Sequence, residues 1–224
     1  MAVSANNVSM GIPTFSPVGV ATAVDIQDIK VQADGIWGGA VQIQTLTAGG
    51  ATDETYLWIP ASEAVDMGME GEGWFDPNTG AAAEKTFAEG EAYVLSNDYG
   101  AGATLLYDGE VLNGATAVPV SANNVSISGN MTPVGFDIQA FVVDADGIWG
   151  GAIQIQTLTA GGATDETYLW IPASEAVDMG MEGEGWFDPN TGAAAEKLFA
   201  AGEGFILSND YGPGATLTIP SALE

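Results

Sequence analysis

Carboxylates supply nearly all of the chemically active side chains in this sequence. The chain carries 30 Asp and Glu residues, three lysines (Lys30, Lys85 and Lys197), no arginine, no histidine and no cysteine, and its formal net charge is −27. Without imidazole or thiol groups the chain cannot form a Ser-His-Asp triad, a thiolate zinc site or a cysteine nucleophile. The chemistry that remains open is the binding of hard cations and acid–base catalysis by paired carboxylates.

Five aspartates lie in segments whose composition suits calcium, which prefers several carboxylate and carbonyl oxygens on a turn-forming backbone. Asp144 and Asp146 stand in the segment Asp-Ala-Asp-Gly, and Asp34 is the repeat of Asp146. Asp76 and Asp188 each begin the segment Asp-Pro-Asn-Thr-Gly. These five residues are the predicted metal ligands, with calcium as the candidate cofactor. The alternative is that the same residues form ordinary type I turns.

A pair of carboxylates could in principle hydrolyse a glycoside. The carboxylates that lie near one another in the sequence are Glu70, Glu72 and Asp76, with their repeats Glu182, Glu184 and Asp188. Because carboxylates occur throughout the chain, this proximity carries little information, and the sequence predicts that the protein is not an enzyme. The wider acidic run from Glu63 to Asp76 contains no lysine. It forms either a face that attracts cations or a solvated loop.

Two tryptophans lie in glycine-rich segments that could leave their rings exposed. Trp37 and Trp149 each occupy the sequence Gly-Ile-Trp-Gly-Gly. Exposed aromatic rings on a β-rich domain can stack on sugar rings, so these residues are the candidates for carbohydrate binding. By contrast, Trp58 and Trp170 lie within alternating segments, which predicts that they pack in the core.

An internal repeat organises the chain. Residues 34–85 recur as residues 146–197, and only Val41 and Ile153 differ within that block. The 112-residue offset is too long for a solenoid repeat and suits a complete domain. We therefore predict two domains related by duplication, the first covering residues 1–115 and the second residues 116–224.

Each copy is predicted to be all-β. Residues 152–158 alternate apolar and polar side chains, as a half-buried strand does, and residues 159–165 have the composition of a hairpin loop. Only the segment from Pro172 to Met179 has helical character, and Gly180 limits it to one or two turns. Short strands separated by frequent turns indicate two tandem β-sandwich or partly closed barrel domains.

The charge balance limits the classes of partner. Nucleic acid and anionic membranes bind through Lys and Arg, which this chain almost lacks, so neither is expected. No apolar run approaches the length of a transmembrane segment. The N-terminus has no signal-peptide pattern, and we interpret Met1 as a start codon placed before a mature secreted chain.

The apolar segment 2–24, which Pro13 and Pro17 interrupt, could pair with its own domain or complete the sheet of a neighbouring chain. Two equivalent domains joined by a strand-like connector suit head-to-tail growth, because a heterologous contact that does not close produces a filament. The expected partner is therefore a second copy of the chain, in a homopolymer.

The end of each copy carries a resemblance. The segments Gly-Trp-Phe-Asp, Phe199–Leu207 and Ala-Thr-Leu-Thr-Ile are similar to the close of β-rich repeat modules of bacterial secreted and surface proteins. This resemblance implies an extracellular or cell-surface location without catalysis. The resulting prediction is a structural subunit that assembles into a fibre or layer by strand pairing and is stabilised by calcium. The alternative is a carbohydrate-binding or adhesion module, with polysaccharide or cell-surface matrix as its partner.

Overall fold

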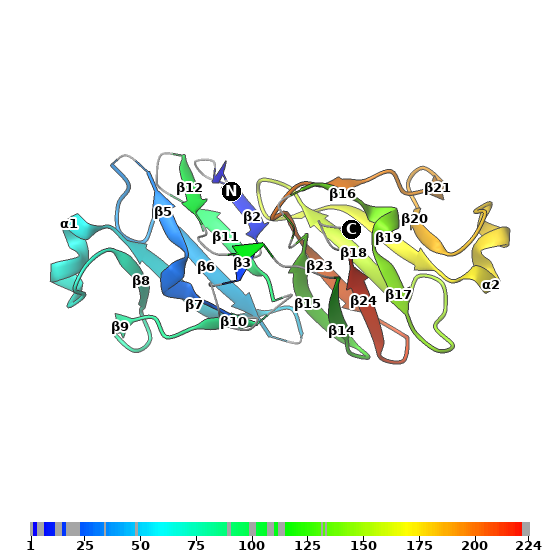
Figure 1. The fold of residues 1–224 in the computed structure, drawn as a ribbon, viewed down its shortest axis with the longest axis horizontal. Helices are drawn as coiled ribbons and strands as arrows, with labels where there is room; N and C mark the ends of the chain where they lie inside the picture. Colours follow the sequence, from blue (N-terminus) through cyan, green and yellow to red (C-terminus); the bar gives the residue numbers. More distant parts are fainter. Residues whose placement is uncertain are drawn as a thin grey trace.

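The computed structural model describes residues 2–3, 7–11, 15–16, 23–33, 35–47, 49–88, 91–98, 102–106, 110–111, 115–130, 132 and 134–220. The strands pair antiparallel throughout this part of the chain. The all-β prediction is therefore confirmed (Figure 1). No helix among the described residues has the length and apolar character that crossing a membrane requires.

The first copy is built on a six-stranded sheet in the order β2-β11-β6-β7-β8-β9. The bounds of these strands are β2 Asn7–Gly11, β11 Tyr93–Asn97, β6 Val41–Leu46, β7 Thr52–Ile59, β8 Gly73–Asp76 and β9 Ala81–Ala82. A three-stranded sheet has the order β1-β12-β5, and two strand pairs, β10-β4 and β13-β3, complete the copy. Their bounds are β1 Ala2–Val3, β12 Ala103–Leu106, β5 Lys30–Gln32, β10 Thr86–Ala88, β4 Ala23–Asp25, β13 Glu110–Val111 and β3 Phe15–Ser16.

The second copy repeats this topology with a six-stranded sheet in the order β15-β23-β18-β19-β20-β21. Its strands are β15 Asn124–Gly129, β23 Gly204–Asn209, β18 Ile153–Leu158, β19 Thr164–Ile171, β20 Gly185–Asp188 and β21 Ala193–Ala194. The smaller sheet β14-β24-β17 corresponds to β1-β12-β5 of the first copy, and the pair β16-β22 corresponds to the pair β10-β4. These strands are β14 Thr116–Val120, β24 Ala215–Ile219, β17 Val142–Asp144, β16 Phe136–Asp137 and β22 Leu198–Phe199.

Helical structure in the described residues is limited to short turns, as the sequence predicts. The segment after Pro172 forms α2 (Ala173–Ala176) and the 3-10 helix η4 (Val177–Met179), and the first copy has α1 (Ala61–Ala64) and η2 (Val65–Met67) in the same place. The remaining turns are the 3-10 helices η1 (Ile26–Asp28) and η3 (Ile138–Ala140). Gly180 ends its helix with a φ of 72°, in the left-handed region that glycine adopts without strain.

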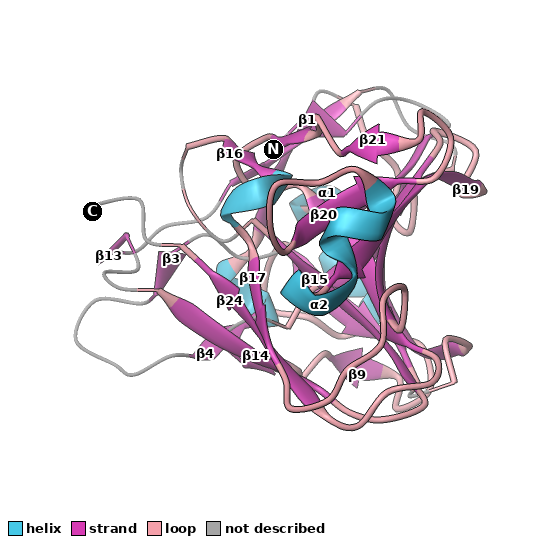
Figure 2. Ribbon diagram, turned by 90° about the vertical axis from the view of Figure 1, so that its right-hand side faces the viewer, coloured by secondary structure: helices cyan, strands magenta, loops and turns pink. Residues whose placement is uncertain are grey.

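The core of each copy lies between its large and small sheets. In the second copy, Ile153 and Leu207 of the six-stranded sheet are fully buried in one cluster with Val143 and Leu217 of the small sheet. Figure 2 shows β14, β17 and β24 on the side of the molecule opposite β19. This arrangement is that of a sandwich, because the inner faces of two sheets share one apolar layer.

Tryptophans occupy the centre of each core. Trp58 and Trp170 are buried, as predicted, and each meets a second buried tryptophan edge to face, at centroid distances of 5.5 and 5.4 Å. These second rings, Trp74 and Trp186, have no exposed surface. Each indole Nε1 donates a hydrogen bond of 2.7 Å to a backbone carbonyl, so the polar atom of the ring is satisfied inside the core.

The two copies meet through equivalent edges. Strand β2 contacts β23, and its counterpart β15 contacts β11, the counterpart of β23. The same edge of each copy therefore contacts the other copy, as in an isologous dimer interface, although both copies belong to one chain. As a result, α1 and α2 lie at opposite ends of the long axis of the molecule (Figure 1).

The apolar N-terminal segment contributes strands to its own chain. Strand β1 pairs with β12, β2 pairs with β11, and β3 pairs with β13. The sequence left open whether this segment pairs with its own domain or with a neighbouring chain. The described strands of the segment pair within the chain.

Candidate functional site

Trp37 and Trp149 are the most exposed aromatic residues that occur at matching positions in the two copies. Their exposed fractions are 74% and 75%. Each follows an isoleucine that is buried, Ile36 or Ile148. The backbone therefore enters each turn anchored in the core and presents the next side chain to solvent.

Hydrogen bonds hold the backbone of the Trp37 turn in place. Gly38 N donates to both carboxylate oxygens of Glu63 at 3.2 Å, and Gly39 N donates to the carbonyl of Trp58 at 2.8 Å. The second copy repeats these bonds from Gly150 to Glu175 and from Gly151 to Trp170. Both tryptophans are thus exposed on ordered turns.

The two glycines after each tryptophan are required by this geometry. A Cβ atom on Gly38 would lie 2.5 Å from Oε2 of Glu63, which is closer than two such atoms can approach. Gly39 has a φ of 81°, a conformation that other residues adopt only with strain. Gly38 thus leaves room for the Glu63 carboxylate, and Gly39 allows the left-handed backbone of the turn.

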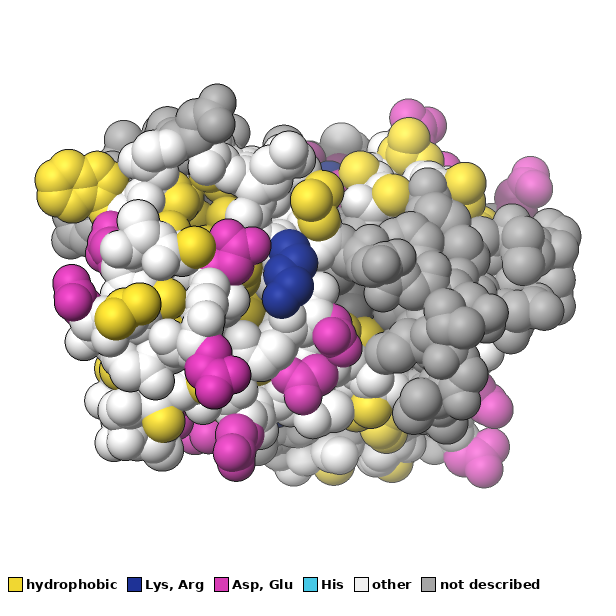
Figure 3. All heavy atoms as spheres, turned by 60° about the vertical axis from the view of Figure 1, so that its left-hand side comes forward, with side chains coloured by type: hydrophobic (Ala, Val, Ile, Leu, Met, Phe, Trp, Pro, Cys, Tyr) yellow, Lys and Arg dark blue, Asp and Glu magenta, His cyan; other side chains and the backbone are white. Residues whose placement is uncertain are grey.

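Further apolar side chains are exposed beside each turn. Val65 and Met67 of η2 follow Glu63 closely, with exposed fractions of 81% and 39%, and Val177 and Met179 of η4 have nearly the same values. We call Trp37, Val65 and Met67 the first tip, and Trp149, Val177 and Met179 the second tip. Figure 3 shows acidic side chains spread between exposed hydrophobic ones on a face of the first copy.

Glu63 and Glu175 anchor the two tryptophan turns, a structural role that sequence reasoning missed. The sequence places both in an acidic run, with no sign that either contacts the tryptophan turn 25 residues earlier. An alignment of the two copies adds nothing, because nearly every residue of this block is identical.

The predicted metal ligands are spread over separate places. Asp34 lies outside the described residues. Asp76 and Asp188 each accept a 2.8 Å hydrogen bond from the backbone N–H two residues later, and this bond lowers the pKa of each carboxyl below its ordinary value of 3.8. Such bonds are those of an Asx turn, in which the aspartate side chain accepts from its own turn. In the part of the chain that the structure describes, no three acidic side chains gather closely enough to hold a metal ion. Calcium binding stays a prediction.

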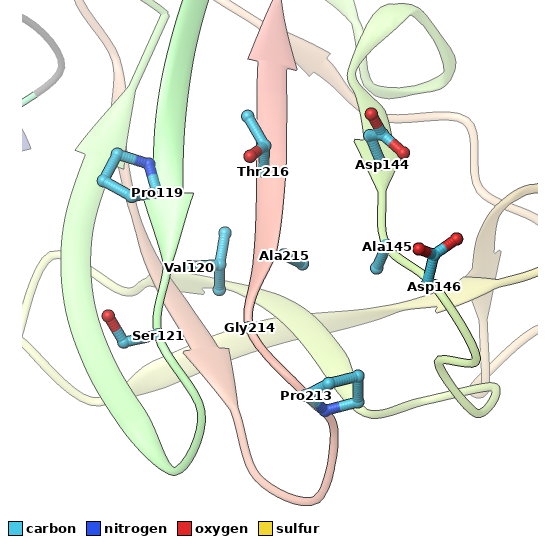
Figure 4. A pocket seen from close by; sticks show the side chains of 10 residues that line it. All are labelled: Pro119, Val120, Ser121, Asp144, Ala145, Asp146, Pro213, Gly214, Ala215 and Thr216. Atoms are coloured by element: carbon cyan, nitrogen blue, oxygen red, sulfur yellow. The ribbon is translucent and has the colours of Figure 1, made fainter.

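Asp144 and Asp146 line an open pocket of about 490 Å³ in the second copy. Figure 4 shows them on one wall, with Pro119 and Ser121 on the other and Thr216 of β24 between them. The rest of the lining is mostly backbone and small side chains. The two carboxylates lie in one pocket, and its lining adds no third acidic residue.

A second pocket, of about 380 Å³, brings three carboxylates together, but not the predicted set. Asp188 lines it with Glu166 and Glu196, whereas Glu182 and Glu184 are exposed elsewhere. A glycosidase needs one carboxyl group that stays protonated as the general acid. The lowered pKa of Asp188 favours its charged form, so this residue does not suit the role of general acid.

Tyr168 in this pocket, and Tyr56 in the first copy, should make the protein sensitive to alkali. Burial, and then the hydrogen bond of 2.7 Å that each hydroxyl donates to Glu166 or Glu54, raises the tyrosine pKa well above its ordinary value of 10.0. Because the folded pKa is raised, this stabilisation is complete below the ordinary pKa and is lost as pH rises above it. We expect the melting temperature to fall above about pH 10. Replacing both tyrosines with phenylalanine should flatten that fall. An equally steep decline in the double variant would assign the alkaline sensitivity to other groups.

Two of the three lysines are paired away from the tips. Lys85 Nζ lies 2.6 Å from Glu91, and Lys197 Nζ lies 2.9 Å from Glu203. The charged side chains that neighbour the tips in sequence are the carboxylates Glu63, Asp66, Glu175 and Asp178.

Comparison of the chain with protein-family models, curated proteins and solved structures gives no match. The geometry of the site is therefore the basis for assigning a function.

Proposed function

We propose that this chain is a non-catalytic extracellular protein that binds uncharged polysaccharide through its two tips. The observation that carries the proposal is the exposure of Trp37 and Trp149 on turns whose backbone is fixed by hydrogen bonds. A large ring on an ordered backbone loses little freedom when a ligand stacks on it. Such a ring offers apolar area that sugar C–H groups can cover.

The charge of the chain selects the kind of glycan. With a net charge of −27, the surface repels polysaccharides that carry carboxylate or sulfate groups. Uncharged sugars meet no such repulsion, and their hydroxyl groups can donate hydrogen bonds to the carboxylates near the tips. The proposed ligand is therefore a neutral glycan.

Two equivalent sites at opposite ends of one chain suit a bridging role. A protein that holds one glycan strand at each tip links the two strands, and on a dense surface both tips bind together with increased avidity. This role fits an extracellular matrix or cell-surface setting, and it needs no catalytic group.

The test is binding of the purified chain to a panel of neutral polysaccharides, with Trp37→Ala, Trp149→Ala and the double variant. We expect each single variant to bind a dense polysaccharide surface about tenfold or more weakly, because avidity is lost, and the double variant to lose binding. Ala81→Ser with Ala193→Ser is the matched control, since it changes exposed positions outside the tips in both copies and leaves the rings. A double tryptophan variant that binds like the wild type, or a wild type that binds no member of the panel, contradicts the proposal.

Self-assembly is the second candidate, and one observation favours it. Both ends of the molecule carry the same exposed apolar residues, so tip-to-tip contacts between chains could extend into a row. This geometry differs from strand pairing, since β1, β2 and β3 already pair within the chain. Negative-stain microscopy of the same variants separates the candidates. Filaments that disappear in the double variant, with no polysaccharide bound, would replace the binding proposal with assembly.

A further inference from the structure

Tyr211 is the most exposed large hydrophobic side chain among the described residues of the second copy. Its exposed fraction is 83%, and it lies in the loop that joins β23 to β24. This loop lies against the Trp149 turn, because Asp210 N donates a hydrogen bond of 3.0 Å to the carbonyl of Ala152. The two most exposed aromatic rings of this copy therefore stand on adjacent loops.

Side-chain bonds reinforce the contact between these loops. The amide of Gln154 donates to Asp210 Oδ2 at 3.1 Å and to the carbonyl of Gly151, two residues after Trp149, at 3.2 Å. Gln154 thus connects the residue before Tyr211 to the tryptophan turn.

The other side of Tyr211 is fixed as well. Gly212 N donates to Asn209 Oδ1 at 2.9 Å, and the amide of Asn209 donates to the carbonyl of Pro213 at 2.7 Å. Gly212 also lies on the side chain of Ile148, from which an added Cβ atom would be only 3.1 Å away. Tyr211 and Trp149 are each one residue from this contact, so their backbones are held as one unit.

We propose that Tyr211 and Trp149 form a two-ring platform that stacks on two sugar rings of one extended, uncharged glycan. The proposal rests on the proposed function and deepens it by adding a residue and a ligand shape. Asp210, between the loops, offers a carboxylate oxygen to a sugar hydroxyl. A ligand that spans two rings must be a chain of sugars, so affinity should depend on chain length.

The test isolates the second tip. In the Trp37→Ala background, binding of a neutral sugar series is measured by calorimetry, from the monosaccharide to the hexasaccharide of the polysaccharide that the wild type binds. We expect Tyr211→Ala to weaken binding of the longer oligosaccharides about tenfold, the worth of one stacked ring, and to change monosaccharide binding little. Tyr211→Phe should retain the affinity. Leu198→Ala, at another exposed position, is the control.

The outcomes separate the two proposals. If Tyr211→Ala binds every oligosaccharide like its parent while Trp149→Ala loses binding, the two-ring platform is wrong and the proposed function stands. If Trp149→Ala also binds like its parent, the proposed function itself fails. Equal weakening by Tyr211→Ala at all chain lengths would contradict a platform that spans two sugars.

Discussion

Replacing Trp186 with alanine should lower the free energy of unfolding by about 3–5 kcal/mol, the usual cost of deleting a buried tryptophan. The ring has no exposed surface and packs edge to face on Trp170 at 5.4 Å with an interplanar angle of 68°. Its Nε1 atom also donates to the carbonyl of Phe141 at 2.7 Å. The substitution thus leaves a cavity in the core and leaves the carbonyl of Phe141 without its hydrogen-bond donor.

Urea unfolding followed by circular dichroism measures this loss. Trp186→Phe separates the two contributions, because it retains most of the packing and removes the donor, at a cost of about 1–3 kcal/mol. Trp149→Ala is the matched control and should change stability by no more than about 0.5 kcal/mol, since its ring is in solvent. A Trp186→Ala protein that unfolds at the wild-type urea concentration would show that the core does not depend on this ring. Trp74→Ala repeats the experiment in the first copy.

The sheet could be predicted from the sequence wherever one face is buried. Strand β18 alternates buried and half-buried residues from Ile153 to Leu158, as its side-chain pattern predicts. The short helical segment after Pro172 was also predictable in its length, because Gly180 ends it. In both places the signal is local, so a single stretch of sequence contains it.

The tips and the acidic pockets were not predictable in the same way. Trp149 could be identified as a candidate from its glycines, but its anchor Glu175 lies in α2 and its neighbour Tyr211 in the loop after β23, and both segments are distant in sequence. For the carboxylates, sequence proximity was misleading. Glu166 lies beside Asp188 because β19 pairs with β20, whereas Glu182 and Glu184 are nearer in sequence and lie outside the pocket. Antiparallel pairing decides which acidic residues meet, and composition cannot reveal it.

The contact between the two copies could not be predicted from the sequence either. This contact is apolar. Met10 and Ala92 of the first copy are buried in the same cluster as Ile127 of the second, and Ala92 N donates to the carbonyl of Ile127 at 3.3 Å. Gly50 lies close enough to Val125 that an added Cβ atom would be 3.3 Å from its Cγ1. Because Met10 and Ala92 of the first copy pack in the core cluster of the second, neither copy can unfold without exposing apolar surface at this contact, and we expect the wild type to unfold in a single transition.

Ala92→Glu should separate the copies. The residue is 4% exposed, so the new carboxylate would be buried among apolar side chains with no partner, which costs several kilocalories per mole. Opening the contact lets that charge reach water and leaves each sandwich with its own core. We expect calorimetry to show two transitions in place of one, and small-angle scattering to show a longer maximum dimension.

Ala81→Glu is the control for Ala92→Glu, since it adds the same charge at an exposed position on β9, an edge strand of the same sheet. It should retain the single transition and the wild-type dimension. The separated variant should also still bind through each tip, because the tryptophan turns draw their hydrogen bonds from within their own copies. Its avidity for a dense surface should fall, as the fixed spacing between the tips is lost. An Ala92→Glu protein that keeps one transition and an unchanged length would mean that this edge contact does not hold the copies together.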